Sequence, residues 1–263
     1  MGRTALTGSA MFLKVIACEI AFREICHLAA RSRNLIDLEF LTQGHHDRPA
    51  EGRAALQERI DQVPEGRYDA ILVGYGLCGS VLPGLRARHT SLVVPRAHDC
   101  ITFFLGSKER YRERFEARPG TYYFSSGWLE CRRRRGLDGP AFQSAFLPAT
   151  AASGFQKTYE EWVRKYGEEK ARYLAEAMGE WSAHYSHGTW IDFEFLRPLN
   201  LAGEVREICS RQGWQFEEVK GDLGLLQRWI DGEWSEEEFL RVPPGRAIRP
   251  AFDERIIELD DGA

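Results

Sequence analysis

Three cysteines follow short apolar runs in the first hundred residues, one directly and two after a turn of four residues. They are Cys18 after residues 12–17, Cys78 after residues 68–73, and Cys100 after residues 91–95. In open α/β sheets, ligands bind beyond the carboxyl ends of parallel strands, so three such strands would bring these thiols to one edge. Three thiolates suit a zinc ion or an iron–sulfur cluster and leave a position for a fourth ligand or a substrate.

The residues beside these cysteines offer further groups for such a site. His98 could be a fourth ligand or an acid/base, and Asp99 could act with it or cap the helix that follows. Arg96 could hold an anionic substrate or pair with Glu19. Glu19 could orient a substrate, although a helix N-terminus attracts acidic residues in any case.

The turn that carries Cys78 is rich in glycine. Gly74, Gly76 and Gly79 permit positive φ and close approach of the backbone, and N–H groups at a helix start can bind an anion or a cofactor phosphate. The pattern lacks the residues of a Walker or dinucleotide motif, so its main expected role is to present Cys78. An alternative chemistry is a Cys78 nucleophile whose pKa is lowered by the following helix, with His98 as its base.

The remaining cysteines and histidines are more typical of core or surface positions. Cys26 and Cys209 are expected in helix cores, and Cys131 beside the arginine run 132–135 is expected in a loop without a role. The other histidine groups, expected at the surface, are His45-His46-Asp47 and the pair His184 and His187.

Apolar runs alternate with helical patterns along the chain. This alternation predicts an α/β fold in which a parallel sheet has helices on both faces, forming two Rossmann-like lobes with a helical excursion between them. The expected strands are 12–17, 35–41, 68–73, 91–95, 120–124, 190–195, 214–219 and 239–242. The expected helices are 19–30, 53–63, 99–115, 202–211 and 223–230, with further helix within 159–181.

These elements suggest a division of the chain into four parts. The expected parts are a loose leader over 1–10, an N-terminal lobe with the cysteine site over 11–150, a helical excursion over 151–188, and a C-terminal lobe over 189–263. The leader lacks the apolar stretch of a signal peptide.

Composition excludes several classes of function. The net charge of -4 argues against a nonspecific nucleic-acid binder, which needs a basic surplus. No apolar run approaches the roughly 20 residues that span a bilayer, so no membrane partner is expected. Six cysteines without a secretion signal indicate reduced thiols and a cytoplasmic location.

Several stretches of the chain resemble a family catalogued as domain of unknown function 1638. They are VIACEI, VGYGLCG, VPRAHDCITFFLGS, PGTYYFSSGW and GDLGLLQRWIDGEW…EFLRVPPG, between about Lys14 and Gly245. Cys18, Cys78, His98, Asp99 and Cys100 lie inside the matching motifs. The resemblance implies a role near one-carbon or corrinoid metabolism, with a corrinoid protein or a methyltransferase as partner.

Together, these features predict a metal-dependent enzyme that acts on a small polar substrate. One alternative is an accessory protein that binds a corrinoid or delivers a metal to a methyltransferase. A second alternative is a hydrolase or transferase that uses Cys78 as its nucleophile.

Overall fold

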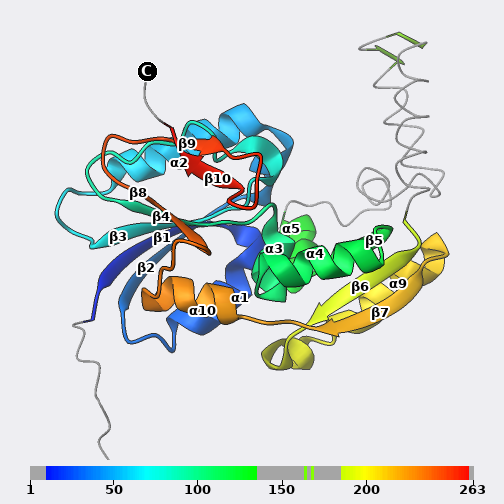
Figure 1. The fold of residues 1–263 in the computed structure, drawn as a ribbon. Helices are drawn as coiled ribbons and strands as arrows, with labels where there is room; N and C mark the ends of the chain where they lie inside the picture. Colours follow the sequence, from blue (N-terminus) through cyan, green and yellow to red (C-terminus); the bar gives the residue numbers. More distant parts are fainter. Residues whose placement is uncertain (1–9, 135–162, 165–166, 169–184, 261–263) are drawn as a thin grey trace, which may run out of the picture. The chain divides into compact units, whose positions relative to one another are not determined.

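A computed structural model of the 263-residue chain describes residues 10–134, 163–164, 167–168 and 185–260. It divides the chain into two compact units, residues 1–111 with 222–263, and residues 112–221. Figure 1 colours both units along the chain, and each is described separately below. Both contain parallel strands connected through helices, so the predicted α/β class is confirmed.

The first unit is built on a five-stranded sheet in the order β2-β1-β3-β4-β8. Its strands are β1 (Phe12–Cys18), β2 (Leu35–Leu41), β3 (Ala70–Gly74), β4 (Leu92–Pro95) and β8 (Phe239–Val242). The first four run parallel, and β8 runs antiparallel to β4. β3 and β4 are buried at every position, as expected of central strands covered on both faces.

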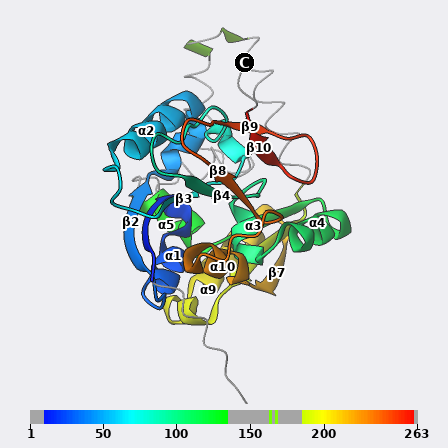
Figure 2. The same ribbon diagram turned by 60° about the vertical axis from the view of Figure 1, so that its left-hand side comes forward.

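Helices cover both faces of this sheet. α1 (Phe22–Ala29) and α10 (Gly224–Asp231) contact each other on one face, and α2 (Pro49–Gln62) covers the other, as Figures 1 and 2 show. The hairpin of β9 (Ile248–Pro250) and β10 (Ile257–Leu259) shares the hydrophobic core under α2. The short helices η1 (Glu19–Ala21), η2 (Gln43–Asp47) and η3 (Cys78–Ser80) follow β1, β2 and β3.

The helix predicted over residues 99–115 is two helices. α3 (Cys100–Leu105) ends at Gly106, whose φ of 84° is left-handed, and α4 (Lys108–Ala117) begins after it. A Cβ at Gly106 would lie 2.6 Å from the carboxyl carbon of Asp222, so glycine is required there for packing as well as for its φ.

The second unit contains a parallel sheet in the order β5-β6-β7. Its elements are β5 (Thr121–Phe124), α5 (Ser126–Arg134), β6 (His187–Asp192), η4 (Glu194–Leu199), α9 (Leu201–Gln212) and β7 (Gln215–Lys220). Its core includes Phe124, Trp190 and Trp214. The run from Cys131, expected in a loop, is helical to Arg134, because Leu129 and Cys131 bury one side of α5.

The division of the chain differs from the one expected. The expected C-terminal lobe over 189–263 is split, because β8 pairs with β4 and returns the chain to the first unit. The second unit is therefore inserted between two parts of the first. Most of the expected leader and helical excursion lies outside the described residues.

Candidate functional site

Neighbouring strands bring the three predicted cysteines together. Cys18 ends β1, Cys78 begins η3 after β3, and Cys100 begins α3 after β4. Because β1, β3 and β4 are adjacent and parallel, their carboxyl ends meet at one edge of the sheet. The three thiols also lie close enough to interact electrostatically. A charge on Cys78 would raise the pKa of Cys18, and a charge on Cys18 or on Cys78 would raise the pKa of Cys100. We call these residues the three-thiol site.

Backbone hydrogen bonds join the two loops that carry Cys78 and Cys100. The N–H of Leu77 donates to the carbonyl of Ala97 over 2.9 Å, and the N–H of Cys78 donates to that of His98 over 2.6 Å. A Cβ at Gly76 would lie 2.7 Å from the Cα of Asp99, so only glycine lets the loops approach this closely.

The glycines of this turn serve packing of the chain itself. A Cβ at Gly74 would lie 2.6 Å from the Cβ of Ala17 and 3.0 Å from the ring of Trp229. Neither Gly74 nor Gly76 has a positive φ, whereas Ser80 does, at 53°. Protein atoms occupy the space that a Cβ would take at Gly74 and Gly76, and Gly79 lies within η3; that these three glycines bind a cofactor stays a prediction.

Burial controls the ionisation of the three thiols. Burial is the main reason why the pKa values of Cys18 and Cys78 are each raised to about 12. Burial also raises the pKa of Cys100 well above the ordinary value of 9.0. A lowered pKa was expected at Cys78, but η3 has only three residues and the charge of Asp99 adds to the effect of burial. Without a cation beside them, these thiols are neutral at pH 7.

The side chains do not already converge as ligands. Among residues 10–134, 163–164, 167–168 and 185–260, no group of three or more His, Cys, Asp or Glu is placed to hold a metal ion. Metal binding would therefore require the thiols to turn toward a common point, at roughly 2.3 Å from zinc.

Asp99 has the capping role that was one of its two predicted roles. Its Oδ1 accepts a hydrogen bond of 2.9 Å from the N–H of Ile101 at the start of α3, and its Oδ2 accepts one of 2.8 Å from the Tyr111 hydroxyl. Burial is the main cause of its raised pKa. The side chain of His98 is exposed, and its backbone carbonyl makes the hydrogen bond to Cys78.

Glu19 lies beside the three-thiol site and binds the loop after β2. Its Oε1 accepts hydrogen bonds from the Thr42 hydroxyl over 3.1 Å and from the N–H of Gln43 over 2.9 Å. The charges of Glu19 and Cys18 both act on Tyr75, so these groups lie near one another.

Tyr75 is a member of this neighbourhood that the sequence analysis missed. Its side chain is 8% exposed, and its buried hydroxyl has no hydrogen-bond partner in the described part of the structure. The sequence feature that could have identified Tyr75 is its position between two glycines, directly after a buried strand.

Arg96 follows β4 as expected, and its guanidinium binds backbone carbonyl oxygens. It donates to the carbonyl oxygens of Glu236 over 2.8 Å and Arg255 over 2.9 Å, and also to that of Ile257. The expected pairing with Glu19 is corrected, because the guanidinium binds the backbone of the C-terminal segment instead.

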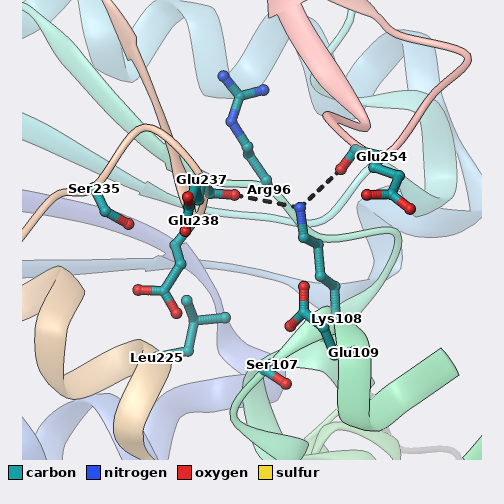
Figure 3. A pocket seen from close by; sticks show the side chains of 9 residues that line it. All are labelled: Arg96, Ser107, Lys108, Glu109, Leu225, Ser235, Glu237, Glu238 and Glu254. Atoms are coloured by element: carbon teal, nitrogen blue, oxygen red, sulfur yellow. Dashed lines mark hydrogen bonds between the residues drawn. The ribbon is translucent and has the colours of Figure 1, made fainter. Parts of the chain in front are cut away.

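Arg96 lines a pocket of about 420 Å³, shown in Figure 3. Lys108 lies in this pocket and donates to the carbonyl oxygens of Glu254 over 2.9 Å and Glu237 over 3.4 Å. Both cations of the pocket therefore bind backbone carbonyls of segments near the C-terminus.

The other cysteines are distributed as follows. Cys209 is buried in the core of the second unit, as predicted, and Cys131 is buried in α5 rather than lying in a loop. Cys26 is half-buried in α1.

The remaining sequence signals lie elsewhere. His45 is half-buried in η2, which contacts η3, and His46 is exposed. His187 begins β6, and His184 lies outside the described residues. In the arginine run, Arg133 pairs with Glu204 at 2.5 Å.

The sequence matches the family described as "Protein of unknown function (DUF1638)" over residues 40–230. The chain belongs to this family, as the resemblance of its motifs predicted. Cys78, His98, Asp99 and Cys100 lie inside the matched range. Comparisons with curated proteins and with solved structures found no match.

Within the described residues, no helix has the length and apolar character needed to cross a membrane.

Proposed function

We propose that Cys18, Cys78 and Cys100 bind a zinc ion or an iron–sulfur cluster and that the protein is an enzyme acting on a small polar substrate. The observation that supports this most is the gathering of three thiols from three neighbouring strands within mutual electrostatic reach. A single cysteine is common in any core, but three half-buried cysteines at the ligand-binding edge of a parallel sheet form a set of ligands suited to a soft metal.

The raised pKa values of the thiols describe the protein without a metal ion. A metal ligand must be a thiolate, and the charge of a bound cation favours the thiolate that burial alone disfavours. The same values argue against Cys78 as a free nucleophile, since that chemistry needs a lowered pKa.

The chemistry depends on which metal is bound. Three thiolates leave one position of a tetrahedral zinc ion open, which suits activation of a substrate thiol for methyl transfer, with a corrinoid protein or methyltransferase as partner. A cluster with three cysteine ligands leaves one iron open, which suits Lewis-acid or redox chemistry. Free cysteines such as Cys18 and Cys78 fit the reducing cytoplasm as the location.

The test is elemental analysis with a visible spectrum on protein purified without oxygen. We expect near-stoichiometric zinc, or iron with broad visible absorption, and loss of most metal when Cys18, Cys78 or Cys100 is changed singly to Ser. Cys209→Ser is the matched control, because Cys209 is buried in the other unit. Full metal content in all three single variants would sink the proposal.

Metal binding without turnover would identify the alternative role. A protein that carries a metal or a corrinoid for a methyltransferase should release it to that partner and co-purify with it.

A further inference from the structure

The pocket that Arg96 lines lies beyond the carboxyl end of β4, at the edge where α/β sheets bind ligands. Its volume of about 420 Å³ is within the range of small-molecule sites, roughly 300–1,000 Å³. Its walls are the start of α4, the residues before β8 and the turn before β10, and Leu225 of α10 also lines it. No residue of the three-thiol site lines it. We call it the β4 pocket.

The two cations of the β4 pocket hold its walls together. Lys108 donates to the carbonyl oxygens of Glu237 and Glu254 and so joins the start of α4 to the other two walls. Arg96 donates to carbonyl oxygens of the same two segments, before β8 and before β10. These bonds lie within the chain itself, so the walls are positioned before any ligand binds, which lowers the cost of binding.

The side chains that face the space between the walls are mainly acceptors. Figure 3 shows the carboxylates of Glu109 and Glu238 reaching toward the space beside Leu225 from different walls. The carboxylate of Glu238 also accepts two hydrogen bonds from Arg228, one of them 2.7 Å long, but each of its oxygens has a second lone pair. Within the described part of the chain, the carboxylate of Glu109 has no ion-pair partner. The hydroxyl of Ser235 is a third acceptor on the wall before β8.

The charge of the β4 pocket favours a ligand with one positive charge. Four glutamates line it, and the cations present are Arg96, Lys108 and the Arg228 that pairs with Glu238. One negative charge is therefore not balanced within the pocket. Among the described residues, no group of three or more His, Cys, Asp or Glu is placed to hold a metal ion, so these carboxylates are too dispersed for a bare cation.

We propose that the β4 pocket binds the ammonium group of a small aliphatic primary amine between the carboxylates of Glu109 and Glu238. An ammonium group has three N–H donors, which match these two carboxylates and the Ser235 hydroxyl. Leu225 is 3% exposed and provides an apolar surface for the alkyl chain. The inference goes beyond the proposed function, because it needs neither a metal ion nor the three thiols.

The experiment is a titration of the ¹⁵N-labelled full chain with butylamine, followed by amide NMR signals. Tetramethylammonium is the matched probe, because it has the same charge but no N–H donor. We expect butylamine to shift the amide signals of residues 107–109 and 235–238, with tetramethylammonium binding much more weakly. Glu109→Gln should bind butylamine about threefold to tenfold more weakly than the wild type does. Glu65→Gln is the control variant, because Glu65 is exposed in the turn before β3 and does not line the pocket.

Three results would overturn the inference. If butylamine leaves the amide signals of residues 107–109 and 235–238 unchanged, the β4 pocket is not an amine site. If tetramethylammonium binds there as tightly as butylamine does, the pocket attracts positive charge without recognising the ammonium group. If Glu65→Gln weakens binding as much as Glu109→Gln does, or if neither variant weakens it, the carboxylate of Glu109 does not hold the amine.

Discussion

The backbone N–H of Cys78 donates a hydrogen bond of 2.6 Å to the carbonyl oxygen of His98. This bond lies beyond the last residues of β3 and β4, so the contact between the two strands continues into the loops that follow them. The loops that contain Cys78 and Cys100, two of the three thiols, are therefore hydrogen-bonded to each other. Their geometry depends on the close approach of Gly76 to Asp99.

Replacing Gly76 by Ala should separate these loops. The new Cβ would lie 2.7 Å from the Cα of Asp99, and backbone cannot rotate away as a side chain can. We expect a loss of about 1–3 kcal/mol in the free energy of unfolding, measured by urea denaturation, and faster alkylation of Cys78 and Cys100. Gly203→Ala in α9 is the control, since nothing lies within 4 Å of that position, and its stability should hold or rise. Equal stability of the two variants would show that the loops are not in contact.

Alkylation of the three-thiol site should be slow in metal-free protein. A pKa of about 12 at Cys18 and Cys78, set mainly by burial, leaves about a thousandfold less thiolate at pH 8 than the ordinary value of 9.0 does. Iodoacetamide labelling followed by mass spectrometry should therefore show both cysteines protected in folded protein and reactive in urea. Rapid labelling of Cys78 alone in folded protein would instead support the nucleophile hypothesis.

The same pKa values set the direction of a stability change with pH. The unfolded thiols ionise near 9.0 while the folded ones stay protonated, so the stability they contribute is complete below pH 9 and falls as pH rises toward 12. Replacing Cys18 by Ala should make the metal-free protein less sensitive to pH in that range, measured by urea denaturation at pH 8 and pH 10. An unchanged pH dependence would mean that Cys18 ionises normally in the folded state.

The sequence was sufficient to predict the position of the cysteines but not the contacts of the residues around them. Buried apolar runs identify β1, β3 and β4, and the parallel pairing that follows from helical connections places Cys18, Cys78 and Cys100 at one edge. The apolar run 239–242 predicted a strand, but four residues do not indicate that β8 pairs with β4 across the inserted unit. The acceptors of Arg96 lie 140 or more residues away, where no local pattern could identify them.

Asp99 should matter for stability through its two hydrogen bonds. Asp99→Ala removes the cap on Ile101 and the acceptor for Tyr111, and should cost about 1–3 kcal/mol of unfolding free energy. Asp99→Asn keeps a side-chain oxygen for the cap and should cost less than half as much. Both are measured by urea denaturation, with metal content determined in parallel. If Asp99→Asn is as stable as the wild type yet loses the metal, Asp99 acts at the site rather than as a cap.

Arg96 should hold the C-terminal segment rather than a substrate. Its guanidinium donates to the carbonyls of Glu236, Arg255 and Ile257, so Arg96→Ala leaves those oxygens to water and frees the turn before β10. We expect a loss of about 1–3 kcal/mol in unfolding free energy and faster amide hydrogen exchange across residues 251–257, with metal content unchanged. Arg88→Ala is the control, because Arg88 is exposed and donates to the carbonyl of Asp61 over 2.9 Å in another part of the unit. Unchanged exchange in Arg96→Ala together with weaker binding of an anionic substrate would restore the role that the sequence suggested.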